Sequence, residues 1–172
     1  MIAKTPMSNF ILSQLLACVA FTCGVLSFQC ERRRSLLLWM SGSALTNACH
    51  FFLLGRIAPG ALYITMGVRV FTAAFTTDRR LMYVFGGLIL VSFAATYQRP
   101  LDLLAMSAAL FATYGNFQKS DRKVRLIYMA CAASWVVHNT LAGSPVAVLM
   151  ELTFLLSNLI GYWRFYRLPA KV

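Results

Sequence analysis

The chain has 172 residues, of which 59% are apolar and only 12% are charged. A soluble domain is typically about 45–50% apolar and about 25% charged. This composition excludes a disordered chain, a collagen-like chain and a disulfide scaffold, and it argues against a water-soluble globule. What remains is an integral membrane protein, with room for about seven spans of about 20 residues each.

Seven apolar runs follow one another along the chain, and charged residues or Gly/Pro turns separate them. The runs are longer than the roughly 10 alternating residues of a membrane barrel strand, so they predict transmembrane helices and an all-α fold. They cover residues 5–30, 35–55, 61–77, 81–97, 101–117, 126–141 and 146–163. We expect loops at Pro59 and Gly60, at residues 119–125 and at residues 143–145.

The net charge of +11 comes from basic clusters between the apolar runs. No recognition helix accompanies them, so we predict no binding to nucleic acid. The loops after the first, third and fifth runs, together with the C-terminal tail, hold 12 of the 16 Lys and Arg residues. Because cytoplasmic loops carry such an excess, we expect the N-terminus outside and the C-terminus in the cytoplasm.

The two halves of the chain resemble each other at an offset of 88 residues. Matching pairs are His50 and His138, Leu53 and Leu141, Gly55 and Gly143, Thr65 and Thr153, and Arg79 and Arg167. We therefore predict one transmembrane domain, residues 1–172, with repeats at about 7–77 and 101–167 joined by a linker helix at about 81–97. A single linking span keeps the second three-helix repeat parallel to the first, and such repeats tend to bind solutes at their interface.

Ionisable residues inside apolar runs are the first candidates for function, because burying a charge in a membrane is expensive. Arg69 lies in the third run and Glu151 in the seventh. Since these runs are equivalent in the two repeats, we expect their helices to face each other. Arg69 would then hold a carboxylate or phosphate with its guanidinium, and Glu151 would take up a coupling proton. A static buried pair is the alternative.

Several polar residues accompany these two charges. Asn47 lies on one helical face with His50, and His138 is the equivalent of His50. The two histidines are candidates for a gate or proton relay, and Asn47, Asn158 and Trp135 for the lining of the site. The alternative explanation is structural: capping and interhelical hydrogen bonding near a helix end for the histidines, and packing or interhelical contacts for the other residues.

Nothing in the sequence points to catalysis. The five cysteines form no C-x-x-C pair, and no Cys/His set has zinc spacing. No Ser/His/Asp or Cys/His motif stands out either. We predict that the chain is not an enzyme and has no metal and no cofactor.

The plan of three helices, a linker helix and three more resembles the SWEET and PQ-loop transporters, although the chain has no Pro-Gln dipeptide. A more specific resemblance is to the YgjV-type family of bacterial inner membrane proteins. In the first half the resemblance rests on the run from His50 to Gly55 and on Gly60, Ala61 and Arg69. In the second half the residues that resemble the family are Trp135, Val136, Val137, His138, Asn139, Ala142, Gly143, Ser144, Glu151, Phe154, Leu155, Leu156, Asn158, Arg164 and Phe165. This resemblance implies a location in the bacterial inner membrane.

The leading hypothesis is a carrier of a small solute, with anions among the candidates, whose site lies between the two repeats. A receptor, regulator or partner subunit that transports nothing is the alternative. The expected partners are the lipid bilayer and the solute, and self-association of the chain is left open.

Overall fold

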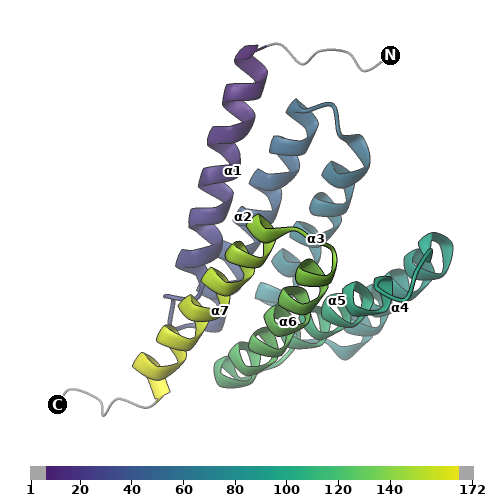
Figure 1. The fold of residues 1–172 in the computed structure, drawn as a ribbon. Coiled ribbons are helices and arrows are strands. Elements are labelled where there is room, and N and C mark those ends of the chain that lie inside the picture. Colours follow the sequence, from purple (N-terminus) through teal and green to yellow (C-terminus); the bar gives the residue numbers. More distant parts are fainter. Residues whose placement is uncertain (1–6, 167–172) are drawn as a thin grey trace.

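The computed structural model of the chain describes residues 7–166, and over this part it contains seven α-helices and no strand (Figure 1). The number of helices predicted from the apolar runs is confirmed. The helices are α1 (Met7–Ser27), α2 (Arg33–Leu53), α3 (Ile57–Phe75), α4 (Arg79–Thr96), α5 (Asp102–Asn116), α6 (Asp121–Leu141) and α7 (Pro145–Tyr166).

Four of these helices, α1, α2, α4 and α7, are long and apolar enough to cross a membrane. In contrast, α5 has 15 residues, and a helix of that length measures about 22 Å, less than the roughly 30 Å of a hydrocarbon core. The described residues therefore form seven helices, of which four satisfy the criteria of length and composition for a membrane span, and the expected number of seven spans stays a prediction.

The loop expected at residues 119–125 is mostly helix. α6 begins at Asp121, and the Ser120 side chain caps it by accepting a hydrogen bond from the N–H of Lys123. The charged side chains of this segment resemble those of a loop, so the sequence analysis places the start of the helix too late. As a consequence Arg125, which we assigned to a cytoplasmic loop, is a fully buried residue of α6.

The loop expected at Pro59 and Gly60 is also absent, because α3 already begins at Ile57. Proline fits the first turn of a helix, where the backbone N–H that it lacks has no partner within the helix. Pro145, expected in a turn, is likewise the first residue of α7.

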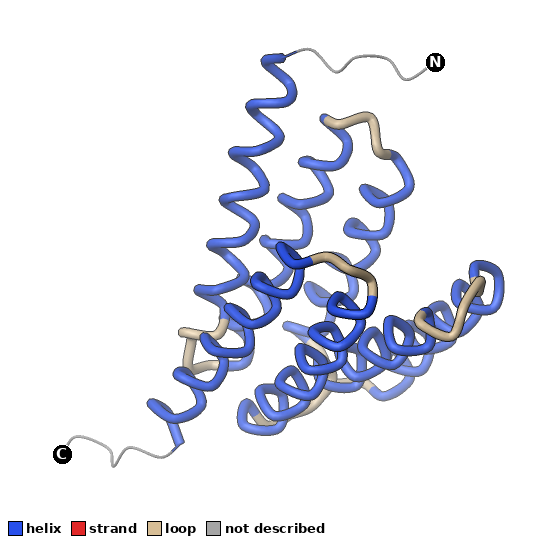
Figure 2. Tube along the Cα trace, in the orientation of Figure 1, coloured by secondary structure: helices blue, strands red, loops and turns tan. Residues whose placement is uncertain are grey.

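The helices form two groups of three neighbours. In one group α2 packs between α1 and α3, and in the other α6 packs between α5 and α7, while α4 packs against α5. The groups meet where α1 touches α7 and where α3 touches α5. In Figure 2, α1, α2 and α3 run side by side, and α4 and α5 cross them at a steep angle. Each third helix thus has the first helix of the other group as its main neighbour there, and the expected facing of α3 and α7 stays a prediction.

The buried core lies between the two groups and draws on both. Its members are Phe28, Leu36, Leu37, Val70, Ala73, Ala74, Ala108, Ala112, Phe117, Val124, Tyr128 and Cys131. The many alanines allow the helices to approach closely, which favours packing inside a membrane. No residue of α4 is buried, and its exposed apolar side chains suit a helix that faces lipid.

Two features recur at the same offset in both groups. α2 and α6 each have 21 residues, and both their starts and their ends lie 88 positions apart. Each helix is followed by a glycine, Gly55 or Gly143, with a φ of 69°. Such a left-handed conformation is open to glycine without the strain that a Cβ would cause.

Candidate functional site

Arg69 is a buried charge with little to balance it. Only 8% of its surface is exposed, and its Nη1 donates a hydrogen bond of 2.8 Å to Thr113 Oγ1 of α5. The same hydroxyl donates to the carbonyl of Ala109. Arg69 Nε has no partner within residues 7–166. A guanidinium offers five N–H donors in a fixed fork, so most of its capacity for binding an acceptor is unused.

A polar patch of α5 continues from Thr113 toward the end of the helix. Asn116, three residues further on, is fully buried, and its Oδ1 accepts a hydrogen bond from the hydroxyl of Tyr128 of α6. Its amide nitrogen Nδ2 has no partner among the described residues. The core between the two groups is therefore not purely apolar, because α5 presents a hydroxyl and an amide to it, and the amide nitrogen of Asn116 is an unfilled donor.

Two further arginines tie the groups together in a reciprocal way. Arg33, at the start of α2, donates from Nη2 to the carbonyls of Ala73 and Asn116. Arg125, near the start of α6, donates from Nη1 to the carbonyl of Phe28 at 2.8 Å. Each arginine thus reaches the chain just at or after the end of the first helix in the other group. We call Arg33 and Arg125 the arginine clamp.

Additional bonds hold the clamp in place. Arg125 also donates from Nη2 to the carbonyl of Cys30, and its own carbonyl accepts from Asn158 Nδ2 at 2.9 Å. The backbone N–H of Arg33 donates to Asp121 Oδ1 at 3.0 Å. Gly161 of α7 provides the space for the contact between Arg125 and Phe28, because a Cβ at Gly161 would overlap the carbonyl oxygen of Phe28.

Sequence reasoning missed both arginines of the clamp, of which Arg125 is buried and Arg33 partly buried. We read residues 119–125 as a loop, although Ser120 followed by Asp121 is a typical helix N-terminus. That signal predicts an earlier start of α6 and places Arg125 on a helix. For Arg33 the sequence holds no comparable signal. It stands between two other arginines, Arg32 and Arg34, which are exposed, and nothing in the sequence distinguishes it from them.

The structure does not join Glu151 to Arg69. Glu151 is half-buried on α7, and within residues 7–166 its carboxylate forms neither an ion pair nor a hydrogen bond. Asn158, which we considered as a lining residue beside it, is 1% exposed and bonds to Arg125. It therefore belongs to the surroundings of the clamp in this conformation.

His50 and His138 lie three residues before the ends of α2 and α6, at the opposite ends of these helices from the clamp. His50 Nδ1 lies 2.7 Å from the carbonyl oxygen of Ser13 of α1. A carbonyl only accepts, so Nδ1 is the donor of this bond. His138 Nδ1 lies 3.2 Å from Asn139 Oδ1, and its ring contacts Trp135 edge-on at 5.1 Å.

Asn47 is half-buried on the same face of α2 as His50. Ser43, on that face too, donates to the carbonyl of Ala20 of α1 at 2.6 Å. This face of α2 therefore packs against α1. Trp135 is partly buried and packs against the core between the groups. Neither histidine nor Asn47 hydrogen-bonds to Arg69 in the described part of the chain.

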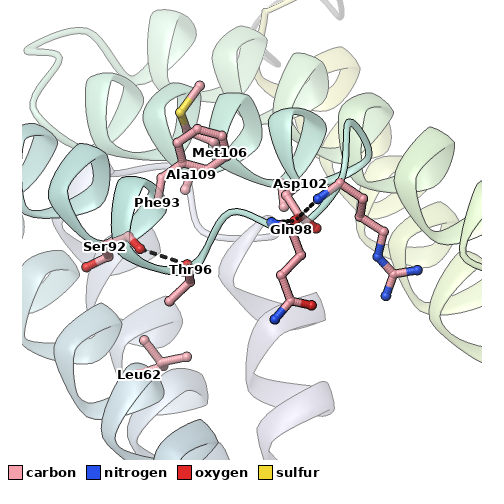
Figure 3. A pocket seen from close by; sticks show the side chains of 10 residues that line it. Leu62, Ser92, Phe93, Thr96, Gln98, Asp102, Met106 and Ala109 are labelled. Carbon is pink, nitrogen blue, oxygen red and sulfur yellow. Dashed lines mark hydrogen bonds between the residues drawn. The ribbon is translucent and has the colours of Figure 1, made fainter.

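A cavity of about 460 Å³ lies at the turn between α4 and α5 (Figure 3). No predicted site residue lines it. Its acidic member, Asp102, accepts bonds of 2.9 Å at Oδ2 from the backbone N–H groups of Gln98 and Arg99. These two bonds close the turn between α4 and α5. Because Arg69 does not line this cavity, we treat the cavity as separate from the site around Arg69.

Comparison with known proteins supports the reading of the chain as a membrane protein. The Imp-YgjV family, described as bacterial inner membrane proteins, matches residues 11–168. The chain belongs to this family. The Imp-YgjV match covers both helix groups and α4, and it confirms the resemblance inferred from the sequence. It also supports a location in the bacterial inner membrane.

A curated relative agrees with this assignment. The chain is 28% identical over 169 residues to the inner membrane protein YgjV of Escherichia coli (strain K12), a match that covers 96% of this chain and 90% of the relative. No solved structure matches the chain.

Proposed function

We propose that the chain is a small-solute carrier of the bacterial inner membrane with seven spans. It consists of two parallel three-helix repeats, residues 7–77 and 101–167, joined by α4. The observation that carries the proposal is Arg69, a buried arginine at the contact between the groups whose described partner is one hydroxyl. Buried charges in membrane proteins mark substrate or ion pathways by default.

The recurring geometry supports the two repeats. α2 and α6 match in length and in their following glycines. The contacts between the groups are reciprocal as well, since α1 meets α7 and α5 meets α3. The arginine clamp adds a third correspondence, because Phe28 and Asn116, whose carbonyls it binds, are 88 residues apart. A twofold relation along the membrane normal explains all three observations.

The distribution of charge supports one orientation. The first residue of α1 and the last residue of α7 lie at opposite ends of the molecule (Figure 1), as an odd number of crossings requires. The clamp lies at the end with the basic loops, so we assign it to the cytoplasmic side. His50 and His138 are then near the outer surface.

An anion is the solute class that Arg69 favours. A carboxylate or phosphate oxygen would bond to the free Nε and the remaining N–H groups, and its charge would balance the guanidinium. With 8% of Arg69 exposed, this conformation is closed to solvent. Opening toward the cytoplasm requires the clamp to release, since it holds both groups together at that end.

Thermal unfolding of the purified protein with added solutes tests the proposal. The probes are succinate, acetate, inorganic phosphate and glycerol 3-phosphate, with glucose as a neutral comparison. We expect one class of anion to raise the Tm of the wild type. At a hundredfold excess over Kd, binding should raise the free energy of unfolding by about 2.7 kcal/mol. The rise should vanish in Arg69→Met.

The matched control is Arg56→Met, which removes an exposed arginine just before the same helix and should keep the response. If no anion stabilises the wild type, or if Arg69→Met responds like the wild type, the anion carrier is wrong. A receptor, regulator or partner subunit would then be the better account. Uptake of the stabilising anion into proteoliposomes is the second step.

A further inference from the structure

A second cavity opens where the α3–α4 loop, the start of α4, the end of α5 and the start of α6 meet. Its volume is about 420 Å³, within the range of small-molecule pockets. Arg79, Lys119 and Lys123 line it and are exposed, and none of its ten lining residues is acidic. No ion pair to a carboxylate neutralises these three cations within residues 7–166, so the cavity attracts anions.

The remaining wall of this basic cavity is largely apolar and aromatic. Tyr83 of α4 and Tyr114 of α5 line it with 67% and 51% of their surfaces exposed, and Met82 and Phe117 lie beside them. Gly86 follows one turn further along α4, and no atom lies within 4 Å of the place where its side chain would stand. The face of α4 that carries Tyr83 and Gly86 is therefore open, with Leu90 49% exposed one turn further on, and we call this face the apolar track.

The place of the basic cavity in the fold suits a lipid. It lies among loops at the same end of the bundle as the arginine clamp, where α4 leaves the loop and presents no buried residue. Tyrosines at such a boundary place their hydroxyls at the level of the headgroups and their rings among the acyl chains. Basic pockets between helices on the cytoplasmic side recognise anionic headgroups.

We infer that this cavity binds the headgroup of an anionic phospholipid. Arg79, Lys119 and Lys123 hold the phosphate diester, and an acyl chain follows Tyr83 and Gly86 toward the bilayer interior. A soluble phosphate compound shares the headgroup chemistry and lacks the chain. The apolar track favours the lipid, and the site is separate from Arg69, so it stands whether or not the protein is a carrier.

Native mass spectrometry of the detergent-solubilised protein tests this site. The wild type is titrated with dioleoyl phosphatidylglycerol and with dioleoyl phosphatidylcholine, and we expect it to prefer the anionic lipid. The triple variant Arg79→Gln, Lys119→Gln and Lys123→Gln should bind phosphatidylglycerol roughly 100-fold more weakly, since each basic group near a membrane surface contributes about one factor of five. Its binding of phosphatidylcholine should not change.

A second triple variant, Arg32→Gln, Arg34→Gln and Arg80→Gln, removes the same charge from exposed positions outside the cavity and should bind like the wild type. Equal loss in both triple variants, or no preference between the two lipids, overturns the site.

Gly86→Leu separates the lipid from a soluble phosphate compound. A leucine side chain on the track should lower the affinity for phosphatidylglycerol and should leave the affinity of the cavity for glycerol 3-phosphate unchanged. If Gly86→Leu binds phosphatidylglycerol like the wild type while glycerol 3-phosphate competes with the lipid, the cavity is a site for soluble phosphate compounds and the lipid assignment is wrong.

Discussion

Replacing Arg69 with methionine should stabilise the ligand-free protein. The substitution removes one hydrogen bond, from Nη1 to Thr113. Thr113 keeps its bond to the carbonyl of Ala109 and is not left without a partner. At the same time the substitution removes a charge that is 8% exposed and has no carboxylate partner among the described residues. Methionine is flexible enough to fill the space left in an irregular core.

The balance follows from two opposing magnitudes. A hydrogen bond from a charged group stabilises by about 1.5–3 kcal/mol. Burying an ion costs several kcal/mol, and a well-packed apolar replacement for buried ions often gains about 1–4 kcal/mol. For Arg69→Met we therefore expect a gain of about 1–2 kcal/mol, which corresponds to a Tm higher by roughly 2–8 °C in a chain of this length.

Arg125→Met provides the contrast, because Arg125 is also buried but donates to the carbonyls of Phe28 and Cys30. Its removal leaves these acceptors unpaired at about 1–3 kcal/mol each, so the Tm should fall by roughly 5–15 °C. The assay is thermal unfolding in one detergent, followed by tryptophan fluorescence. If Arg69→Met lowers the Tm as Arg125→Met does, Arg69 is a structural residue and the argument from its unused donors fails.

Four further variants test packing and orientation. Gly161→Ala should destabilise by about 2 kcal/mol or more, because its Cβ meets the carbonyl of Phe28; a Tm equal to that of the wild type would contradict the close contact. Gly42→Ala is its control, since nothing lies within 4 Å of the added Cβ, and it should gain about 0.5–1 kcal/mol as an alanine within a helix. In a cysteine-free background, Gln98→Cys should react with an impermeant maleimide added outside spheroplasts, and Lys119→Cys should react only after lysis. The reverse labelling would invert the proposed orientation.

The sequence predicts the helices well because apolar runs bounded by charges are the strongest signal that a membrane protein carries. It misplaces the start of α6, since the charged residues between Asp121 and Arg125 look like a loop when burial is unknown. Arg side chains are mostly exposed, and the approach of the chain at Phe28 and Cys30, together with Asn158 and Gly161 of α7, buries this one.

The partner of Arg69 is out of reach of sequence reasoning for a different reason. Thr113 is a small polar residue in an apolar run, where a hydroxyl commonly bonds to the carbonyl of its own helix, as it does to Ala109. Its second role depends on α3 packing against α5. Pairing Arg69 with Glu151 assumed that equivalent helices face each other, whereas the reciprocal contacts place unlike helices together.

The arginine clamp has a consequence for how freely the loops can vary in evolution. The side chains of Arg33 and Arg125 bind backbone carbonyls, at Ala73, Asn116, Phe28 and Cys30. Every amino acid has that carbonyl, proline included. Substitutions at the four acceptor positions therefore leave the acceptors in place, and the clamp itself requires only the side chains of Arg33 and Arg125. Phe28, Ala73 and Asn116 are constrained instead by their own burial. A saturation mutagenesis of this region should find tolerance at Cys30 beside intolerance at Arg125.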